Sequence, residues 1–311
     1  MDETVERNIM NLNIELLKKK FGKNLIIKEN LSKYSWFNLG GPADIFFRPE
    51  NKNQILNFFK QLKGQTYNFH ILGAGSNTLI RDSGIKGIVI KLSSKFSQIK
   101  LLEKNLIEAG AATLDKKVSD FAKDNSLSGM EFLSCIPGSI GGAVVMNSGC
   151  YGSDISKVLH SIKILDLNGI EKVIKRDEIN FFYRGSNLPK DYLILSVVLE
   201  GTSSSRDLIE KKQSELIIKK KESQPSQIKT GGSTFKNNNK KKAWALIKES
   251  GCDKFSVGDA KISEKHCNFF INNGNAKASD IEKLINKVKQ EVKYKTGVSL
   301  ELEIKIIGNE N

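Results

Sequence analysis

Cysteine is scarce in this 311-residue chain, and its four copies stand far apart: Cys135, Cys150, Cys252 and Cys267. No two of them form a C-x-x-C pair, which excludes a redox motif of that type and a zinc ribbon. His266 adjoins the last of them, but no second ligand pair has the spacing of a zinc site. We therefore expect free, mostly buried thiols and no bound metal.

Long apolar runs are missing as well. The apolar stretches at residues 194–195 and 197–199 are much shorter than the roughly 20 residues that a helix needs to cross a bilayer. The acidic opening at residues 1–7 contains no apolar segment of the kind found in a secretory signal. The sequence thus predicts a cytoplasmic protein with no membrane partner.

Aromatic side chains are absent from the most basic stretches. The net charge is +14, and lysine supplies nearly all of the positive charge, as in residues 219–221 and 240–242. A basic surface attracts either nucleic acid or small phosphorylated ligands. Proteins that stack bases place aromatic residues among their cations, however. We therefore interpret the excess as solvated lysine and expect no nucleic-acid partner.

The residues that are present predict an α+β fold of two or three domains. Apolar residues at helical spacing predict helices at 5–17, 55–62, 207–222 and 243–249. Strand-like patterns occur at 44–48, 68–72, 87–92, 162–167 and 192–199. The polar segment 202–206 indicates a domain boundary before the lysine-rich helix.

Near the C-terminus, Ser279 and Glu282 have the spacing of a capping box and predict the start of another helix. Residues 298–307 alternate apolar and charged side chains, as in a half-buried strand. That alternation places Glu301 and Glu303 on the same face.

Two glycine-rich segments are suited to bring backbone amides close to an anion. The first consists of Gly73, Ala74, Gly75, Ser76 and Asn77. The second contains Ile136, Pro137, Gly138, Ser139, Gly141 and Gly142. Neither is a Rossmann motif, because Thr78 stands where the third glycine belongs, and neither is followed by the lysine of a P-loop. A single such loop is more often an ordinary turn, whereas two of them favour a dinucleotide that the spacing does not identify.

Eight blocks in unbroken order between residues 32 and 308 resemble the UDP-N-acetylenolpyruvoylglucosamine reductase family. They lie at residues 36–44, 71–77, 129–142, 147–152, 183–186, 232–237, 258–269 and 303–308. Among them are Tyr183-Arg184-Gly185-Ser186 and Gly232-Ser233-Thr234-Phe235-Lys236-Asn237. A set of ordered blocks is much more specific than any one motif.

The resemblance implies a two-part FAD-binding region of the vanillyl-alcohol-oxidase (PCMH) type, at residues 1–92 and 93–205. A C-terminal α+β substrate-binding domain would follow at 206–297, with a strand at 298–311 that returns to the active site. FAD and NADPH are the implied cofactors, and the two glycine-rich segments would hold FAD. The implied reaction reduces UDP-N-acetylglucosamine enolpyruvate to UDP-N-acetylmuramate for peptidoglycan, and we expect a monomer.

The resemblance also assigns roles to side chains. Arg184 and Glu303 would stabilise the enolate-like intermediate, and Ser233 would protonate it. Tyr183, Arg184 and Asn237 would bind the substrate. Glu303 is preferred to Glu301 because the family's glutamate stands five residues before the closing glycine, which is Gly308 here. Taken without the resemblance, these residues are more simply a surface cation, a turn residue and a solvated strand residue.

Some positions depart from the family pattern. Cys135 stands where many members have glycine, and Asn238 and Asn239 replace two prolines. The connection at residues 200–206 is too short for the tyrosine-bearing loop of one branch, which places this chain in the shorter branch. Two alternatives remain open: an FAD oxidoreductase of the same fold with another substrate, and a basic protein that binds nucleic acid.

Overall fold

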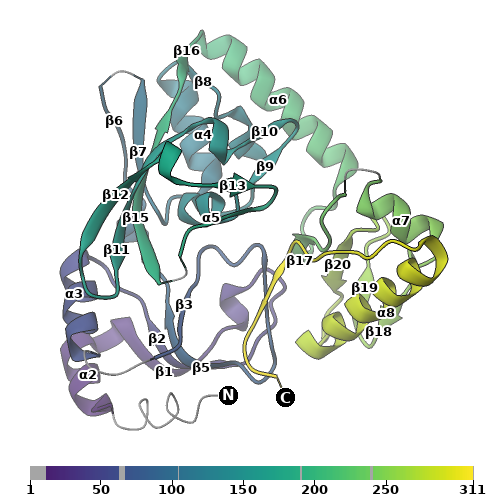
Figure 1. The fold of residues 1–311 in the computed structure, drawn as a ribbon, viewed down its shortest axis with the longest axis horizontal. Coiled ribbons are helices and arrows are strands. Elements are labelled where there is room, and N and C mark those ends of the chain that lie inside the picture. The colour runs from purple at the N-terminus through teal and green to yellow at the C-terminus, as the bar shows by residue number, and fades with distance from the viewer. Residues whose placement is uncertain (1–11, 63–66, 104, 190, 239–240, 311) are drawn as a thin grey trace. The chain divides into compact units, whose positions relative to one another are not determined.

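The computed structural model (Figure 1) describes residues 12–62, 67–103, 105–189, 191–238 and 241–310. The chain forms two compact units that alternate along the sequence. The first unit contains Met1–Ile26, Ile45–Ala74 and Gly87–Lys220, and the second contains Ile27–Asp44, Gly75–Lys86 and Lys221–Asn311. Helices and strands occur in both, so the α+β class is confirmed. The four-part division predicted above stays a prediction.

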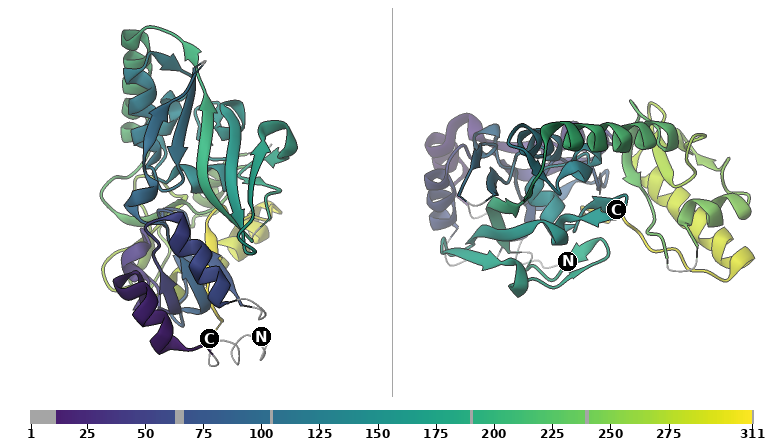
Figure 2. Two further views of the ribbon diagram at one scale, coloured as in Figure 1. Left: turned by 90° about the vertical axis from the view of Figure 1, so that its left-hand side faces the viewer. Right: turned by 90° about the horizontal axis from the view of Figure 1, so that it is seen from above.

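Strands of the first unit form a five-stranded antiparallel sheet in the order β12-β11-β15-β7-β6. In the order of the sheet, their bounds are Glu171–Lys175, Leu159–Asp166, Tyr192–Glu200, Leu106–Gly110 and Ile99–Leu101. Helices α4 (Asp115–Asp124) and α5 (Ile140–Val145) contribute to the same apolar core as this sheet (Figures 1 and 2). Val118 and Val144 of the helices and Val197 of β15 are fully buried there. The predicted strands at 162–167 and 192–199 are confirmed.

The N-terminal part begins with α2 (Ile14–Phe21), so most of the helix predicted at 5–17 falls outside the described residues. Helix α3 (Lys52–Gln61) starts where the Asn51 side chain accepts a hydrogen bond from the Gln54 amide. Its buried Phe58 stacks on Phe47 with 4.1 Å between ring centroids. A four-stranded sheet has the order β1-β2-β5-β3, with bounds Leu25–Asn30, Pro42–Phe47, Ile85–Ile90 and Phe69–Ile71.

The second unit has an antiparallel sheet in the order β17-β20-β19-β18, with bounds Lys229–Ser233, Phe269–Asn272, Ala260–Ile262 and Ser256–Val257. Helix α8 (Ala278–Thr296) packs on three of these strands and on α7 (Ala243–Glu249). Its apolar stripe is buried: Ile281, Leu284, Ile285, Val288 and Val292. Phe37, Leu39 and Leu79 complete this core, although they precede the rest of it by about 150 residues or more of sequence.

The predicted capping box of α8 has the wrong residues, because the carboxylate that accepts from the N-cap amide belongs to Asp280 and the amide to Lys277 (2.9 Å). The helix begins one residue earlier, at Ala278, and its first amides are capped from a distant loop. The Asp82 carboxylate accepts from the Ala278 amide (2.8 Å) and from the Ser279 amide (2.9 Å). Glu282 binds the Arg81 guanidinium instead, with Nε–Oε1 at 3.0 Å. Residues 81–82 therefore supply both the acceptor for the first two helical amides and the partner of Glu282.

The strand predicted at 298–307 is also shorter than expected. Only β21 (Lys305–Ile307) is a strand, and it pairs in parallel with β4 (Thr78–Ile80). Upstream, Leu302 forms a single antiparallel bridge with Phe235. Leu300 and Ile304 are nevertheless buried, so the apolar alternation reports burial rather than continuous pairing.

Helix α6 (Arg206–Ser223) follows β15 after five residues that include the short strand β16 (Thr202–Ser203), which confirms the short connection. Among the described residues, every helix is too short or too polar to cross a membrane. The same residues hold no cluster of three or more His, Cys, Asp or Glu side chains suited to a metal ion.

We predict that Asp82→Ala lowers the free energy of unfolding by about 1–2 kcal/mol, because two amides at the positive end of α8 lose their acceptor. Urea denaturation of the apoprotein measures this change. Asp82→Asn keeps one oxygen acceptor without the charge, so we expect a smaller loss. Equal stability of the Ala variant and the unmodified protein would show that the cap contributes nothing.

Candidate functional site

The first glycine-rich segment joins β3 to β4, and its glycines have different tasks. Gly75 has φ of 73°, and a Cβ atom on it would lie 1.9 Å from the Tyr34 carbonyl oxygen, so only glycine fits. Its own carbonyl accepts from the Trp36 amide at 3.1 Å.

The carbonyl of Gly73, at the other end of the segment's glycines, accepts a hydrogen bond from the Lys91 ammonium group. Burial, and then the charge of Arg48, lower the pKa of Lys91 to about 8.

The second segment lies between the 3₁₀ helix η4 (Glu131–Cys135) and α5. The Ile140 amide donates to the Thr113 carbonyl (2.8 Å), and the Gly138 carbonyl accepts from the Asp115 amide (3.2 Å). A Cβ atom on Gly141 would lie 2.9 Å from the Ala111 Cβ, so this glycine allows the helix to pack closely. The segment is therefore held firmly against the end of β7.

The two segments meet inside the first unit. A Cβ atom on Gly73 would lie 2.9 Å from Ser139 Oγ and 3.9 Å from Gly142 Cα. At Gly142 itself, an added Cβ would have only Ser139 Oγ near it, at 3.6 Å. Glycine at these positions keeps backbone accessible on both sides of Ser139, as a diphosphate-binding cradle requires. We call Gly73, Ser139 and Gly142 the glycine cradle.

A buried acid lies beside this cradle, at a position that no local sequence pattern marks. Asp115 is fully buried, and neither of its carboxyl oxygens has a hydrogen-bond partner among the described residues. The buried Thr113 hydroxyl is in the same situation. Leu114, between them, forms a β-bridge with Ser139. Burial raises the pKa of Asp115 well above its usual range, so the neutral acid is favoured.

Arg184 lies in the turn between β13 (Phe181–Phe182) and β14 (Gly185–Ser186), with φ of 57°. Its Nη2 donates to the Gly149 carbonyl at 2.8 Å, and its guanidinium lies 4.9 Å from the centre of the Tyr183 ring. The left-handed conformation and these contacts give the guanidinium a defined position.

A pocket of about 310 Å³ opens beside this turn, lined by Asn147, Asp154, Ser156, Phe181, Phe182, Tyr183 and Arg184. Asn147 supports its rim, since its side chain donates to the Phe182 carbonyl (3.3 Å) and accepts from the Ser156 amide (3.0 Å). Asn147 belongs to a recognised sequence block, whereas nothing in the local pattern marks Asp154 or Ser156 as pocket residues.

Ser233 ends β17 in the second unit, opposite Phe269 and after an irregularity in the strand pairing. Bulges of this kind change the direction of the following side chains. Asn268 fixes the next residues by accepting from the Phe235 amide (2.9 Å) and donating to its carbonyl (2.8 Å). The Asn268 amide donates in turn to His266 Nδ1 (3.2 Å), and burial lowers the pKa of this histidine. His266 therefore supports the loop that leads into β20.

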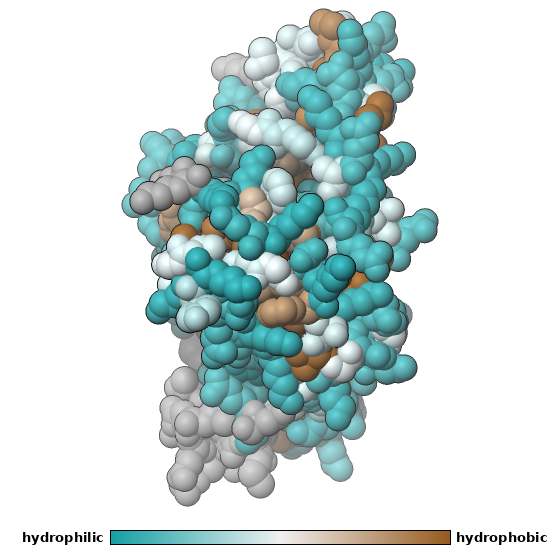
Figure 3. All heavy atoms as spheres, turned by 90° about the vertical axis from the view of Figure 1, so that its right-hand side faces the viewer, coloured by the Kyte–Doolittle hydropathy of each residue, from teal (hydrophilic) through white to brown (hydrophobic). Residues whose placement is uncertain are grey.

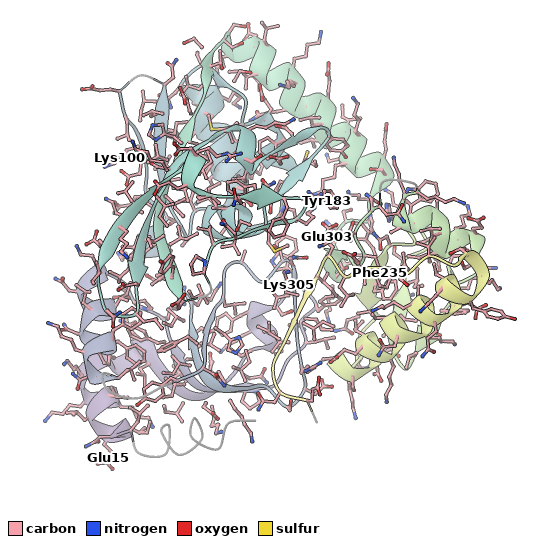
Figure 4. All side chains as sticks on the ribbon, in the orientation of Figure 1. Glu15, Lys100, Tyr183, Phe235, Glu303 and Lys305 are labelled. Atoms are coloured by element: carbon pink, nitrogen blue, oxygen red, sulfur yellow. The ribbon has the colours of Figure 1, made fainter. Side chains whose placement is uncertain are left out.

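Glu303 is the glutamate whose backbone bonds the residue next to Ser233. Its amide donates to the carbonyl of the neighbouring residue, Thr234 (2.9 Å), and its carbonyl accepts from the Asn77 side chain (3.2 Å). Glu301 is exposed, and its carboxylate lies 3.8 Å from Lys236 Nζ. Figure 4 shows Glu303 and Lys305 along the C-terminal segment, near Phe235. Asn77 thus serves here as a support for the C-terminal segment.

The predicted site residues divide between the two units. The first holds Tyr183, Arg184, the second glycine-rich segment, Gly73 and Ala74; the second holds Gly75, Ser76, Asn77, Ser233, Asn237 and Glu303. Asn237 has a structural task in addition, because its side-chain oxygen accepts from the Ala243 amide at the start of α7 (3.0 Å).

Known proteins resemble the chain along nearly its whole length. A family model described as the C-terminal domain of UDP-N-acetylenolpyruvoylglucosamine reductase matches residues 224–307, and an FAD binding domain model matches residues 43–174. The enzyme of that name from Pelagibacter ubique (strain HTCC1062) is 47% identical over 296 residues, which cover 93% of this chain and 98% of the relative. The one from Gluconobacter oxydans (strain 621H) is 43% identical and covers 90% of this chain and 91% of the relative. A crystal structure of the Thermus caldophilus enzyme superposes with a TM-score of 0.78 at 30% identity, covering 91% and 97% of the two chains.

The two glycines at the start of α5 should respond differently to substitution. We expect Gly142→Ala to leave the melting temperature of the apoprotein unchanged while weakening FAD binding about tenfold or more, because the added methyl group occupies the open cradle. Gly141→Ala, the matched control, should lower the melting temperature because of its contact with Ala111. Flavin fluorescence quenching measures the affinity. Unchanged FAD affinity of Gly142→Ala would contradict the cradle.

Asp115 should make stability depend on pH. Its carboxyl stabilises the fold while protonated, and this contribution is lost as the pH rises from the ordinary aspartate value of 3.8 towards the raised pKa. We expect Asp115→Asn to unfold at higher denaturant than the unmodified apoprotein at pH 7, but not at pH 4. The gap should grow by up to about 1.4 kcal/mol per pH unit between the two pKa values. A gap independent of pH would contradict the raised pKa.

Proposed function

The chain belongs to the UDP-N-acetylenolpyruvoylglucosamine reductase family, and we propose that Arg184, Ser233 and Glu303 carry its reaction. It is an FAD-dependent oxidoreductase of peptidoglycan synthesis, with NADPH as reductant and UDP-N-acetylglucosamine enolpyruvate as substrate. The observation that carries this conclusion is the 47% identity that spans 93% of this chain and 98% of its relative. The glycine cradle of the first unit fits the cofactor, since it leaves backbone open around Ser139.

Arg184 is proposed to bind the carboxylate of the enolpyruvyl group. When bound and reduced by NADPH, FAD would supply a hydride for the terminal carbon of the enolpyruvyl group. An electron-rich enol ether accepts a hydride only if the negative charge that moves into the carboxylate is stabilised. Arg184 is suited to this because a guanidinium stays charged and presents a planar set of donors. Its bond to the Gly149 carbonyl holds it before substrate binds, which lowers the cost of reorganisation.

Ser233 is proposed to give its hydroxyl proton to the α-carbon of the intermediate, and Glu303 to hydrogen-bond the same intermediate. A general acid must be positioned accurately, and the Asn268 bonds to Phe235 hold the backbone two residues after Ser233. Glu303 is tied to Thr234 through its amide, so serine and glutamate belong to one hydrogen-bonded framework. Glu301 instead is exposed and pairs with Lys236, which supports the choice of Glu303 as the glutamate of the site.

The remaining predicted contacts keep their proposed roles. Tyr183 and Asn237 bind the UDP-sugar, and the two glycine-rich segments hold FAD. The oxygen of Asn237 already bonds α7, which leaves its amino group as the donor to substrate.

We also propose that the protein works as a cytoplasmic monomer. All four cysteines are free thiols, as is usual in a reducing compartment. On the face shown in Figure 3, polar residues predominate and apolar ones form small separate groups, without the broad apolar patch typical of a permanent interface.

Flavin reduction by NADPH and flavin reoxidation by the enolpyruvyl sugar can be measured separately, and only the second step requires Ser233 and Glu303. Under anaerobic conditions NADPH should bleach the flavin band, and the enolpyruvyl sugar should restore it. In Ser233→Ala we expect bleaching at the normal rate and restoration slowed about 100-fold or more, because only the second step needs the proton. Stopped-flow absorbance measures both rates.

Glu303→Gln should slow the second step as well, whereas Glu301→Gln, its matched control, should slow neither. Equal effects of the two glutamine variants would remove Glu303 from the mechanism. If NADPH bleaches the flavin band of the unmodified protein but the enolpyruvyl sugar never restores it, the protein acts on another substrate.

A further inference from the structure

Two thiols of the first unit face each other beside Arg184. Cys135 ends η4, and Cys150 lies in β9 (Gly149–Cys150), which packs on η4. Cys150 Sγ donates to the Phe132 carbonyl oxygen of η4 (3.5 Å), three residues before Cys135 in the same 3₁₀ helix, and the two thiols are close enough to shift each other's pKa in opposite directions. No function described above uses either sulfur.

The surroundings give the two sulfurs different reactivity. The hydrogen bond from Cys150 lowers the pKa of Cys135, and Ser134 and the charge of Lys220 act in the same direction against burial. Lys220 is close because its Nζ donates to the Cys135 carbonyl at 2.9 Å. The interaction with Cys135, together with burial, raises the pKa of Cys150. Cys135 is thus the nucleophile and Cys150 the thiol that resolves it.

We propose that Cys135 and Cys150 form a peroxide-sensitive dithiol that, once oxidised to a disulfide, displaces the support of Arg184 and weakens the reaction. The oxidant is a hydroperoxide. The Cys135 sulfur attacks the terminal hydroxyl oxygen of the hydroperoxide, the O–O bond breaks, and the other oxygen leaves as water or alcohol with the thiol proton, so that a sulfenic acid remains. The Cys150 sulfur then attacks that sulfur, the S–O bond breaks, and water leaves with the thiol proton. Two thiols and one hydroperoxide give one disulfide, one water and one further water or alcohol.

The link to Arg184 runs through one residue. Gly149, the neighbour of Cys150, supplies the carbonyl that accepts from Arg184. A disulfide draws the two sulfurs to about 2.05 Å, which is shorter than any hydrogen-bond contact between them. On its other side β9 is closely packed, since a Cβ atom on Gly149 would lie 2.3 Å from the Ser153 carbonyl oxygen. The shortening therefore has to move β9 or η4, and with β9 the carbonyl that holds the guanidinium.

The burial of Cys135 limits the size of the oxidant that can reach it. Cys135 is only 4% exposed, so a small hydroperoxide reaches it more easily than a bulky disulfide such as oxidised glutathione. Cys252, in the second unit, is completely buried, and burial raises its pKa, which makes it an unreactive internal reference.

The test treats FAD-loaded protein with hydrogen peroxide and measures intact mass, peptide-mapped disulfides and half-reaction rates. We expect a loss of two hydrogen masses, a Cys135–Cys150 peptide, and reversal by dithiothreitol. Cys150→Ala should give a sulfenic acid at Cys135 that dimedone traps, whereas Cys135→Ala should leave Cys150 unmodified. Cys267→Ala, the matched control, should form the disulfide normally.

For the oxidised protein we expect kcat/KM for the enolpyruvyl sugar to fall about tenfold or more while flavin reduction by NADPH is unchanged. Two thiols that stay reduced under peroxide would overturn the proposal. A disulfide without a change in kcat/KM would overturn its link to Arg184. The role of Arg184 rests on the proposed function, but the mass measurement does not need substrate, so failure of the dithiol and failure of the assigned reaction are distinguishable.

Discussion

The second unit depends on the hydrogen bonds made by one short segment, Gly75–Lys86, to parts of the chain that follow it by about 200 residues. At one end, Asn77 accepts from the Lys305 amide and donates to the Glu303 carbonyl. At the other end, Asp82 caps α8. Each of these partners is a backbone group that would be costly to leave unsatisfied. The position of the glutamate proposed for the reaction is therefore set by a residue of a glycine-rich segment whose expected task was to bind FAD.

Much of this architecture is predictable because its signals are local. The α7 bounds, the apolar stripe of α8 and the strands of the five-stranded sheet all follow from periodicity over a few residues. The approach of the two glycine-rich segments is consistent with their interpretation as parts of one dinucleotide site. The family itself is recognisable because its blocks occur in the same order.

Features that depend on distant partners were not predictable in this way. Ser279 and Glu282 have the sequence of a capping box, but the carboxylate of Asp82 takes that place from 196 residues away. Asp115 stands in an amphipathic helix among lysines, where a charged residue is normally exposed, yet it is fully buried. Residues 298–304 alternate like a strand because alternate side chains are buried, although most of the backbone has no strand partner there. Local sequence patterns therefore indicate which side chains are buried, but they do not identify the distant part of the chain that buries them.

The pairing of β21 with β4 also limits when the second unit can form during synthesis. Leu79 of β4 is paired with Ile306, which follows it by 227 residues of sequence (306 − 79). At a translation rate of about 5–20 residues per second, β4 waits roughly ten to forty-five seconds for its neighbour. The second unit is thus completed only after Ile306 has been synthesised and has left the ribosome. Until then β4 is an unpaired strand, and protecting it falls to the nascent chain itself or to a chaperone.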